Sequence, residues 1–70
     1  MTLAARIRRA VNHSQGARSA TEIARALKAS PAAVSSFLHR ERVAGRVVAH
    51  CAPSVYRADK TAWRYLAFPR

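Results

Sequence analysis

Residues that could carry covalent or metal chemistry are few in this 70-residue chain. Ser54, His50 and Asp59 supply the residue types of a hydrolytic triad, but they fall in one short segment without a scaffold to orient them, and a triad is defined by its geometry. The three histidines and the single cysteine show neither C-x-x-C nor H-x-x-x-H spacing, and the adjacent His50 and Cys51 would point to opposite faces of a strand. The sequence therefore predicts no enzyme, no catalytic residue, no metal site and no cofactor.

Positive charge is the dominant chemical feature of the chain. Thirteen Lys and Arg residues stand against three acidic residues, which gives a formal net charge of +10 at pH 7. Such a charge density opposes compaction by self-repulsion, and it is typical of proteins whose partner is a polyanion. Nucleic acid is the first candidate partner, an anionic membrane the second and an acidic protein surface the third. No apolar run approaches the roughly 18 residues that a membrane span needs, and a helix lying on a membrane surface would carry more bulky apolar residues than Leu3, Ile7 and Val11, so we expect no membrane partner.

The segment from residue 21 to residue 45 is where most of this chemistry would be positioned. Apolar residues repeat there at helical spacing in two groups, which are Ile23, Ala24 and Leu27, then Val34, Phe37 and Leu38. Between the two groups, Ser30 can cap a helix and Pro31 suits its first position, where a missing N–H costs nothing. The pattern predicts two short helices joined by a tight turn, the second of them over residues 31–42.

This segment resembles the helix-turn-helix of winged-helix DNA-binding proteins, in the manner of bacterial multiple-antibiotic-resistance-type and isocitrate-lyase-type regulators. The residues that carry the resemblance are Ile23-Ala24, Leu27, the Ala29-Ser30 turn, Val34-Ser35, Phe37-Leu38 and Gly45 followed by Val47. Lys28 stands where those families usually carry glycine, and Glu41 where they usually carry a core leucine. The resemblance implies an α+β fold, with residues 1–70 forming a single three-helix winged helix-turn-helix domain with a small antiparallel β-sheet and a C-terminal β-hairpin wing.

The resemblance also assigns roles to residues, because the second helix of a helix-turn-helix lies in the major groove and its N-terminal half contacts base edges. The base-contacting residues would be Ser30, Ala32, Ser35, Ser36, His39 and Arg40. The residues expected on phosphates are Thr21, Arg25, Lys28, Arg42, Arg57 and Lys60, and such contacts position a protein without specifying sequence. Because alanine and serine discriminate poorly between bases, we expect an affinity that is mostly electrostatic and a modest sequence preference.

The N-terminal part of the chain predicts one further helix and one short strand. Thr2 can cap a helix that runs to about His13, and Arg6 and Arg9 on its outer face are expected to be ordinary surface charges. Residues 17–19 are short enough to form the first strand of a winged helix. Ser19 and Glu22 then fit the capping box of the next helix, which makes Glu22 structural.

After residue 46 the apolar period changes from helical to two. This change predicts two antiparallel strands, one over about 47–51 and one over about 63–68. Between them, either a long loop begins at 52–54, or the first strand continues through 55–57 to a turn at 58–61. Either version places Arg57 and Lys60 near the tip of a hairpin.

The core of so small a chain must use nearly every bulky apolar residue. The expected core residues are Leu3, Ile7, Val11, Ile23, Leu27, Val34, Phe37, Leu38, Val47 and the aromatic C-terminal segment, with Trp63 or Leu66 filling part of it. Glu41 falls on the inward side of the second predicted helix. Either that helix loosens after Arg40, or Glu41 sits at the edge of the core and pairs with an arginine.

The leading hypothesis is a small basic DNA-binding protein, a bacterial or phage transcriptional regulator whose partner is double-stranded DNA. One alternative is a winged-helix protein-interaction module with an acidic partner surface, such as a phage-encoded inhibitor of a host nucleic-acid-binding complex; a second is a membrane-active basic peptide. The protein would be a monomer, or a homodimer through the first helix or the aromatic strand at 63–66. A lone Cys51 favours a reducing cytoplasm, in a bacterial cell or a phage-infected host.

Overall fold

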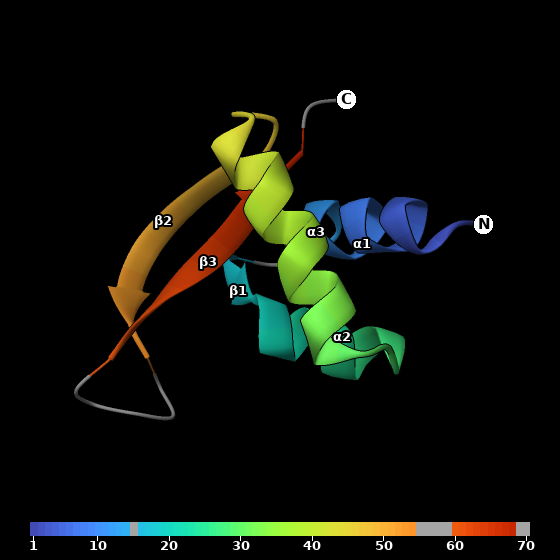
Figure 1. The fold of residues 1–70 in the computed structure, drawn as a ribbon, viewed down its shortest axis with the longest axis horizontal. Coiled ribbons are helices and arrows are strands. Elements are labelled where there is room, and N and C mark those ends of the chain that lie inside the picture. The colour runs from blue at the N-terminus through green and yellow to red at the C-terminus, as the bar shows by residue number, and fades with distance from the viewer. Residues whose placement is uncertain (15, 55–59, 69–70) are drawn as a thin grey trace.

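The computed structural model describes residues 1–14, 16–54 and 60–68, and these residues form three helices and a three-stranded antiparallel sheet. The elements follow one another as α1 (Leu3–Asn12), β1 (Arg18–Ser19), α2 (Ala20–Leu27), α3 (Pro31–Val43), β2 (Val48–Pro53) and β3 (Thr61–Ala67). The predicted α+β class, with three helices and a small antiparallel sheet, is confirmed. In Figure 1, α3 lies at the front, α1 and α2 lie behind and below it, and the sheet extends to one side.

Each helix begins at the residue that the sequence marked as its cap. The side chains of Thr2, Ser19 and Ser30 each accept a hydrogen bond from the backbone N–H three residues further on, at 3.2, 3.3 and 3.4 Å. These bonds satisfy N–H groups that have no partner inside the helix. Glu22 is structural, as expected, and its carboxylate lies 3.2 Å from the guanidinium of Arg64 on β3.

The C-terminal ends of α2 and α3 share one geometry but use different residues. At each end a residue with positive φ donates its N–H to the carbonyl three residues back, and the next residue donates to the carbonyl five back, which is the Schellman motif. In α3 that residue is Gly45, with φ of 75°, and in α2 it is Lys28, with φ of 54°. Glycine adopts this conformation without steric cost, whereas the Cβ of lysine makes it unfavourable by about 1 kcal/mol.

The sheet has the strand order β1-β3-β2, so the C-terminal strand β3 lies in its centre. β2 pairs with β3 from Val48 opposite Ala67 to Pro53 opposite Thr61, with a register shift between Val48 and Ala49. The prediction that a long loop begins at 52–54 is therefore wrong, because strand pairing continues through Pro53. The alternative extension through 55–57, and the first half of the predicted turn at 58–61, lie outside the described residues; Thr61, the last residue of that turn, is the first residue of β3.

The core lies where the three helices meet the sheet. Its buried apolar residues are Ile7, Val11, Ile23, Ala24, Val34, Leu38, Val47, Tyr65 and Phe68, with Leu27 and Phe37 packed against them. The prediction was wrong for Leu3, which is 36% exposed in the first turn of α1. It was also wrong for Trp63 and Leu66, which are 39% and 45% exposed, whereas Tyr65 and Phe68 of the same segment are buried.

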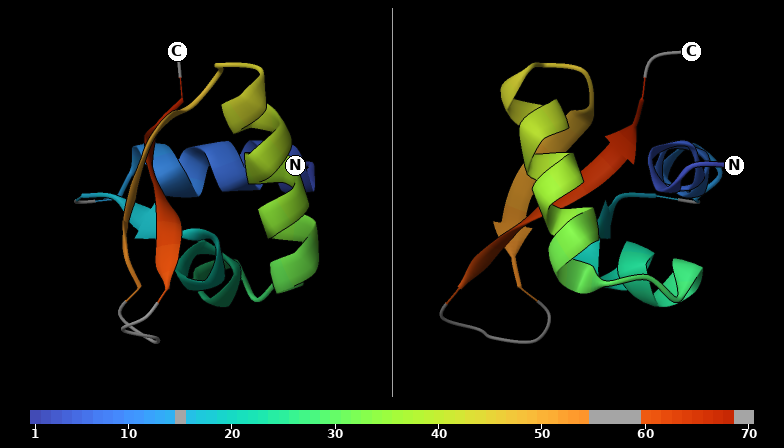
Figure 2. Two further views of the ribbon diagram at one scale, coloured as in Figure 1. Left: turned by 60° about the vertical axis from the view of Figure 1, so that its left-hand side comes forward. Right: turned by 45° about the vertical axis from the view of Figure 1, so that its right-hand side comes forward.

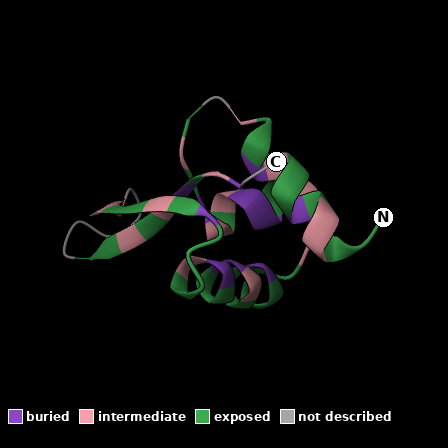
Figure 3. Cartoon of the chain, turned by 90° about the horizontal axis from the view of Figure 1, so that it is seen from above, coloured by how far each residue is buried: buried purple, intermediate pink, exposed green. Residues whose placement is uncertain are grey.

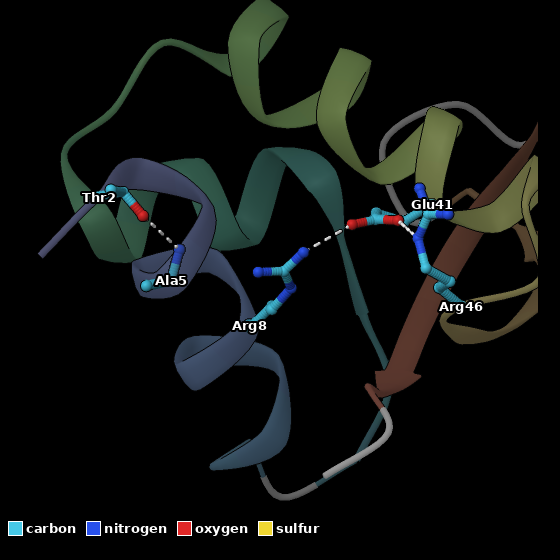
Figure 4. A network of polar contacts seen from close by, with 5 residues as sticks. All are labelled: Thr2, Ala5, Arg8, Glu41 and Arg46. Atoms are coloured by element: carbon cyan, nitrogen blue, oxygen red, sulfur yellow. Dashed lines mark hydrogen bonds and ion pairs between the residues drawn. The ribbon is translucent and has the colours of Figure 1, made fainter.

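Glu41 lies inside the protein and is paired with two arginines. α3 continues through it to Val43, so the hypothesis of a helix that loosens after Arg40 is wrong and the hypothesis of a paired core-edge carboxylate is confirmed. Arg8 of α1 approaches the Glu41 carboxylate to 3.0 Å, and Arg46 binds its other oxygen (Figure 4). The guanidinium of Arg8 also lies 5.4 Å from the ring centre of Phe37.

Among the described residues, none of the helices combines the length and the hydrophobicity that crossing a bilayer would require.

Candidate nucleic-acid interface

The outer side of α3 carries the residues that were expected to contact bases. All of them are exposed, namely Ser30, Ala32, Ser35, Ser36, His39 and Arg40. The buried residues Val34, Leu38 and Glu41 occupy the opposite side of the same helix, as the helical period requires. Figure 2 shows α3 from two further directions, and Figure 3 shows its buried residues turned toward the rest of the molecule. The side of α3 that contains the two serines and His39 is therefore open to a partner.

Arg40 and Arg42 lie on opposite flanks of this open side, because successive residues are about 100° apart around a helix. Arg40 is exposed, whereas Arg42 is half-buried beside the sheet. The guanidinium carbon of Arg42 lies 4.0 Å from the ring centre of Trp63 on β3, which is a cation–π contact. Arg42 therefore connects α3 to the hairpin instead of extending into solvent.

Arg42 also fixes the chemistry that His39 can offer. One guanidinium nitrogen of Arg42 lies 2.9 Å from Nδ1 of His39. Because arginine can only donate, Nδ1 must be the acceptor, and the proton of the neutral imidazole is then on Nε2. His39 consequently presents one N–H donor to a partner while this bond is in place.

The residues that were expected on phosphates lie on three elements. Thr21, Arg25 and Lys28 are exposed at spacings of four and three along α2 and its C-terminal end, so they share one side of that helix. Lys60 is exposed immediately before β3. Arg57 lies outside the described residues, so the structure places five of the six predicted phosphate-binding residues; four of these are exposed, and Arg42 is half-buried against Trp63.

The two described acidic residues contribute little negative charge to the surface, because both form ion pairs with arginines. The Glu41 and Glu22 side chains are only 4% and 22% exposed, and both bind arginines, whereas Asp59 lies outside the described residues. Burial alone raises the pKa of the Glu41 carboxyl, but hydrogen bonds and positive charge from Arg46 and Arg8 outweigh burial and hold that pKa below its usual value of 4.5. Glu41 is therefore ionised and neutralised at physiological pH, and no described carboxylate is exposed beside α3.

Several arginines have structural roles that the sequence did not reveal. Arg6, which was expected to be a surface bystander, donates a hydrogen bond of 2.8 Å to the carbonyl of Leu27 at the end of α2. Arg64 donates to the carbonyl of Ala17 at 2.9 Å in addition to its pair with Glu22. Nothing in the local sequence marks these contacts, since each joins residues more than twenty positions apart.

The described residues contain no group of three or more His, Cys, Asp or Glu side chains that could hold a metal ion. His50 and Cys51 are exposed neighbours on β2, opposite Arg64 and Trp63 of β3. No protein-family model, no curated protein and no solved structure matches the chain. The function is therefore inferred from the geometry and the chemistry of the chain itself.

Proposed function

We propose that this chain is a small winged helix-turn-helix protein that binds double-stranded DNA, placing α3 in the major groove and the β2–β3 hairpin along the phosphates. The element order, with one short strand before α2 and two antiparallel strands after α3, is the order expected of a winged helix. A protein of this kind, in a bacterial cytoplasm or a phage-infected cell, would act as a transcriptional regulator.

One observation carries the proposal. Exposed cations stand on α2 and its C-terminal end, on α3 and immediately before β3, while both described acidic side chains are held in ion pairs with arginines. A polyanion that approaches α3 therefore meets positive charge without repulsion from any described carboxylate. This arrangement supplies the electrostatic part of DNA binding, which dominates non-specific affinity.

The chemistry of the open side of α3 limits how well bases can be distinguished. Ala32 can contact only a thymine methyl group, and serine hydroxyls both donate and accept. Arg40 can form a bidentate contact with guanine, and His39 offers a single donor because its other nitrogen accepts from Arg42. We therefore expect a modest preference for sequence, dominated by the position that faces Arg40.

The test is a titration of a fluorescein-labelled duplex of about 20 base pairs at several salt concentrations, followed by anisotropy. If about six to eight phosphates are neutralised, the slope of log K against log salt should be about −5 to −7. Arg40→Gln should weaken binding about tenfold and reduce the slope by about one. Arg9→Gln, which removes an equal charge from α1, should change binding by less than about twofold.

A slope near zero would remove the DNA hypothesis, as would equal losses from the Arg40 and Arg9 substitutions. The first result would show that phosphates are not the partner. The second would show that net charge alone, and not the surface around α3, governs binding.

A protein-interaction module is the second candidate function, and the composition of the same side of α3 favours it. Ala32 and Val43 are exposed there, Val43 to 70%, between serines that make weak directional contacts. An acidic protein surface could use the same cations. A folded chain that shows no salt-dependent affinity for DNA would support this function, and capture of a partner through α3 would then be lost in a Val43→Glu variant.

Either function is compatible with a monomer. β3 pairs with β2 along its length, and on its other side β1 pairs only with Arg64 and Tyr65, so a homodimer through the aromatic strand would have to form beside this short strand.

A further inference from the structure

A second cluster of cations lies away from α3, over a cavity between α1 and the end of α2. The cavity has a volume of about 430 Å³ and is lined by Met1, Arg6, Arg9, Ala10, His13 and Leu27. Sites for small organic ligands usually measure about 300–1,000 Å³ and combine an apolar floor with a few convergent polar groups. The size and the lining of this cavity match that description.

The cavity lies beside α1, whose two sides differ: one packs into the core and the other carries basic residues. Ile7 and Val11 turn one face into the core, where both are fully buried. Arg6, Arg9 and His13 follow one another at spacings of three and four, so they form a single stripe beside Ala10. The apolar part of the lining comes from Met1, Ala10 and Leu27 beneath this stripe.

The two arginines of the stripe have no carboxylate to neutralise them among the described residues. Both described acids are engaged elsewhere, Glu41 by Arg8 and Arg46, and Glu22 by Arg64. Arg6 is held by the carbonyl of Leu27, which leaves its charge uncompensated. Arg9 and His13 form no ion pair with any described residue. Positive charge therefore surrounds an apolar hollow that contains no acidic lining residue.

We propose that this cavity binds a small amphipathic organic anion, with an apolar body against Met1, Ala10 and Leu27 and a single carboxylate against Arg9 and His13. The apolar lining disfavours inorganic anions, since they would leave the floor unoccupied. The uncompensated cations favour a charged ligand over a neutral one of the same shape. Arg6 lines this cavity and donates to the Leu27 carbonyl at the end of α2, so the apolar body of the ligand, which contacts Leu27, would lie near the end of that helix.

The proposal is tested with naphthalene-2-carboxylate, followed through the backbone amide signals of the ¹⁵N-labelled protein in the absence of DNA. We expect saturable shifts confined to the end of α1 and to the residues around Leu27. Naphthalene-2-methanol, which has the same apolar body without the charge, should bind at least about fivefold more weakly, because contacts to charged groups contribute more than neutral ones.

Two matched variants separate this site from general attraction to a basic protein. Arg9→Gln should weaken binding of the carboxylate about five- to tenfold, because it removes one charge-assisted contact. Arg40→Gln removes the same charge from α3 and should leave the affinity unchanged. His13→Gln gives a second variant at the site; Arg9 and His13 are both exposed, and neither forms an ion pair with a residue that the structure describes.

The proposal is overturned if the alcohol binds as tightly as the carboxylate, if Arg9→Gln and Arg40→Gln weaken binding equally, or if the shifts spread over the sheet and α3. An Arg9→Gln loss of DNA affinity as large as that of Arg40→Gln would also overturn it, because the stripe would then belong to the DNA surface. DNA binding and binding of the carboxylate are measured separately, so either proposal can fail without the other.

Discussion

Replacing Glu41 by glutamine or by leucine tests how its buried carboxylate, which lies beside α1, contributes to the stability of the fold. The Glu41 side chain is 4% exposed, while its partners Arg8 and Arg46 are 48% and 61% exposed. A glutamine at this position keeps the shape but loses the charge, and one buried amide must then face two guanidinium donors. We expect Glu41→Gln to lower the free energy of unfolding by about 1–3 kcal/mol, the cost of an imperfectly satisfied buried polar group.

Leucine at the same position should behave differently. The two arginines are already about half exposed, so both can be solvated by water when the carboxylate is removed. Leucine also places apolar volume at the edge of the core, and replacing a buried ion pair by a well-packed apolar residue is often neutral or stabilising. We expect Glu41→Leu to lie within about 1 kcal/mol of the natural chain, or above it.

The assay is urea denaturation of the three proteins, followed by the fluorescence of Trp63, the single tryptophan. Because the pKa of Glu41 is lowered in the folded protein, its contribution is fully present above the unfolded value near 4.5 and is lost as the pH falls through the lower folded value. The gap between the natural chain and Glu41→Gln should therefore close in acid. A Glu41→Leu variant less stable than Glu41→Gln, or a gap that persists at low pH, would refute the reasoning.

Three further substitutions test the helix ends and the contact between α3 and the hairpin. Lys28→Gly should raise the free energy of unfolding by about 0.5–1 kcal/mol, because it removes the strain of a positive φ. Gly45→Ala should lower the free energy of unfolding by about 1 kcal/mol, because it introduces the same strain. Equal and opposite changes in the urea midpoints of the two variants would confirm both predictions. Trp63→Leu should lower the free energy of unfolding by about 1 kcal/mol, because it removes the cation–π contact with Arg42. Urea denaturation followed by far-ultraviolet circular dichroism measures this change, and an unchanged stability would show that the contact contributes nothing.

Local sequence was sufficient for the helices because their signals are local. A cap needs a hydroxyl three residues before the N–H that it accepts from, and Thr2, Ser19 and Ser30 all stand at that spacing. The buried positions of α3 follow from the helical period in the same way. The exposure of Ser35 and His39 is a further consequence, since they lie on the opposite side of the helix from Val34 and Leu38.

The strands were less well predicted because an alternating pattern does not say which face is covered or how far along the strand the core reaches. Trp63 and Leu66 were assigned to the core on their size, but Leu66 lies on the other face from the buried Tyr65, and Trp63, on the same face as Tyr65, lies nearer the hairpin tip. Of the two alternatives for the end of β2, the one that began a loop at 52–54 was wrong, since a proline is tolerated on an edge strand and Pro53 lies on one.

What the sequence determined by itself is therefore the set of helices, the presence of a small antiparallel sheet and the excess of positive charge. Only the tertiary structure decided which arginines remain available to a partner. Arg8, Arg46 and Arg64 neutralise buried or half-buried carboxylates, Arg6 holds the end of α2 and Arg42 stacks on Trp63. These pairings join residues distant in the chain, and their energies depend on burial and distance, which no local pattern of residue types contains.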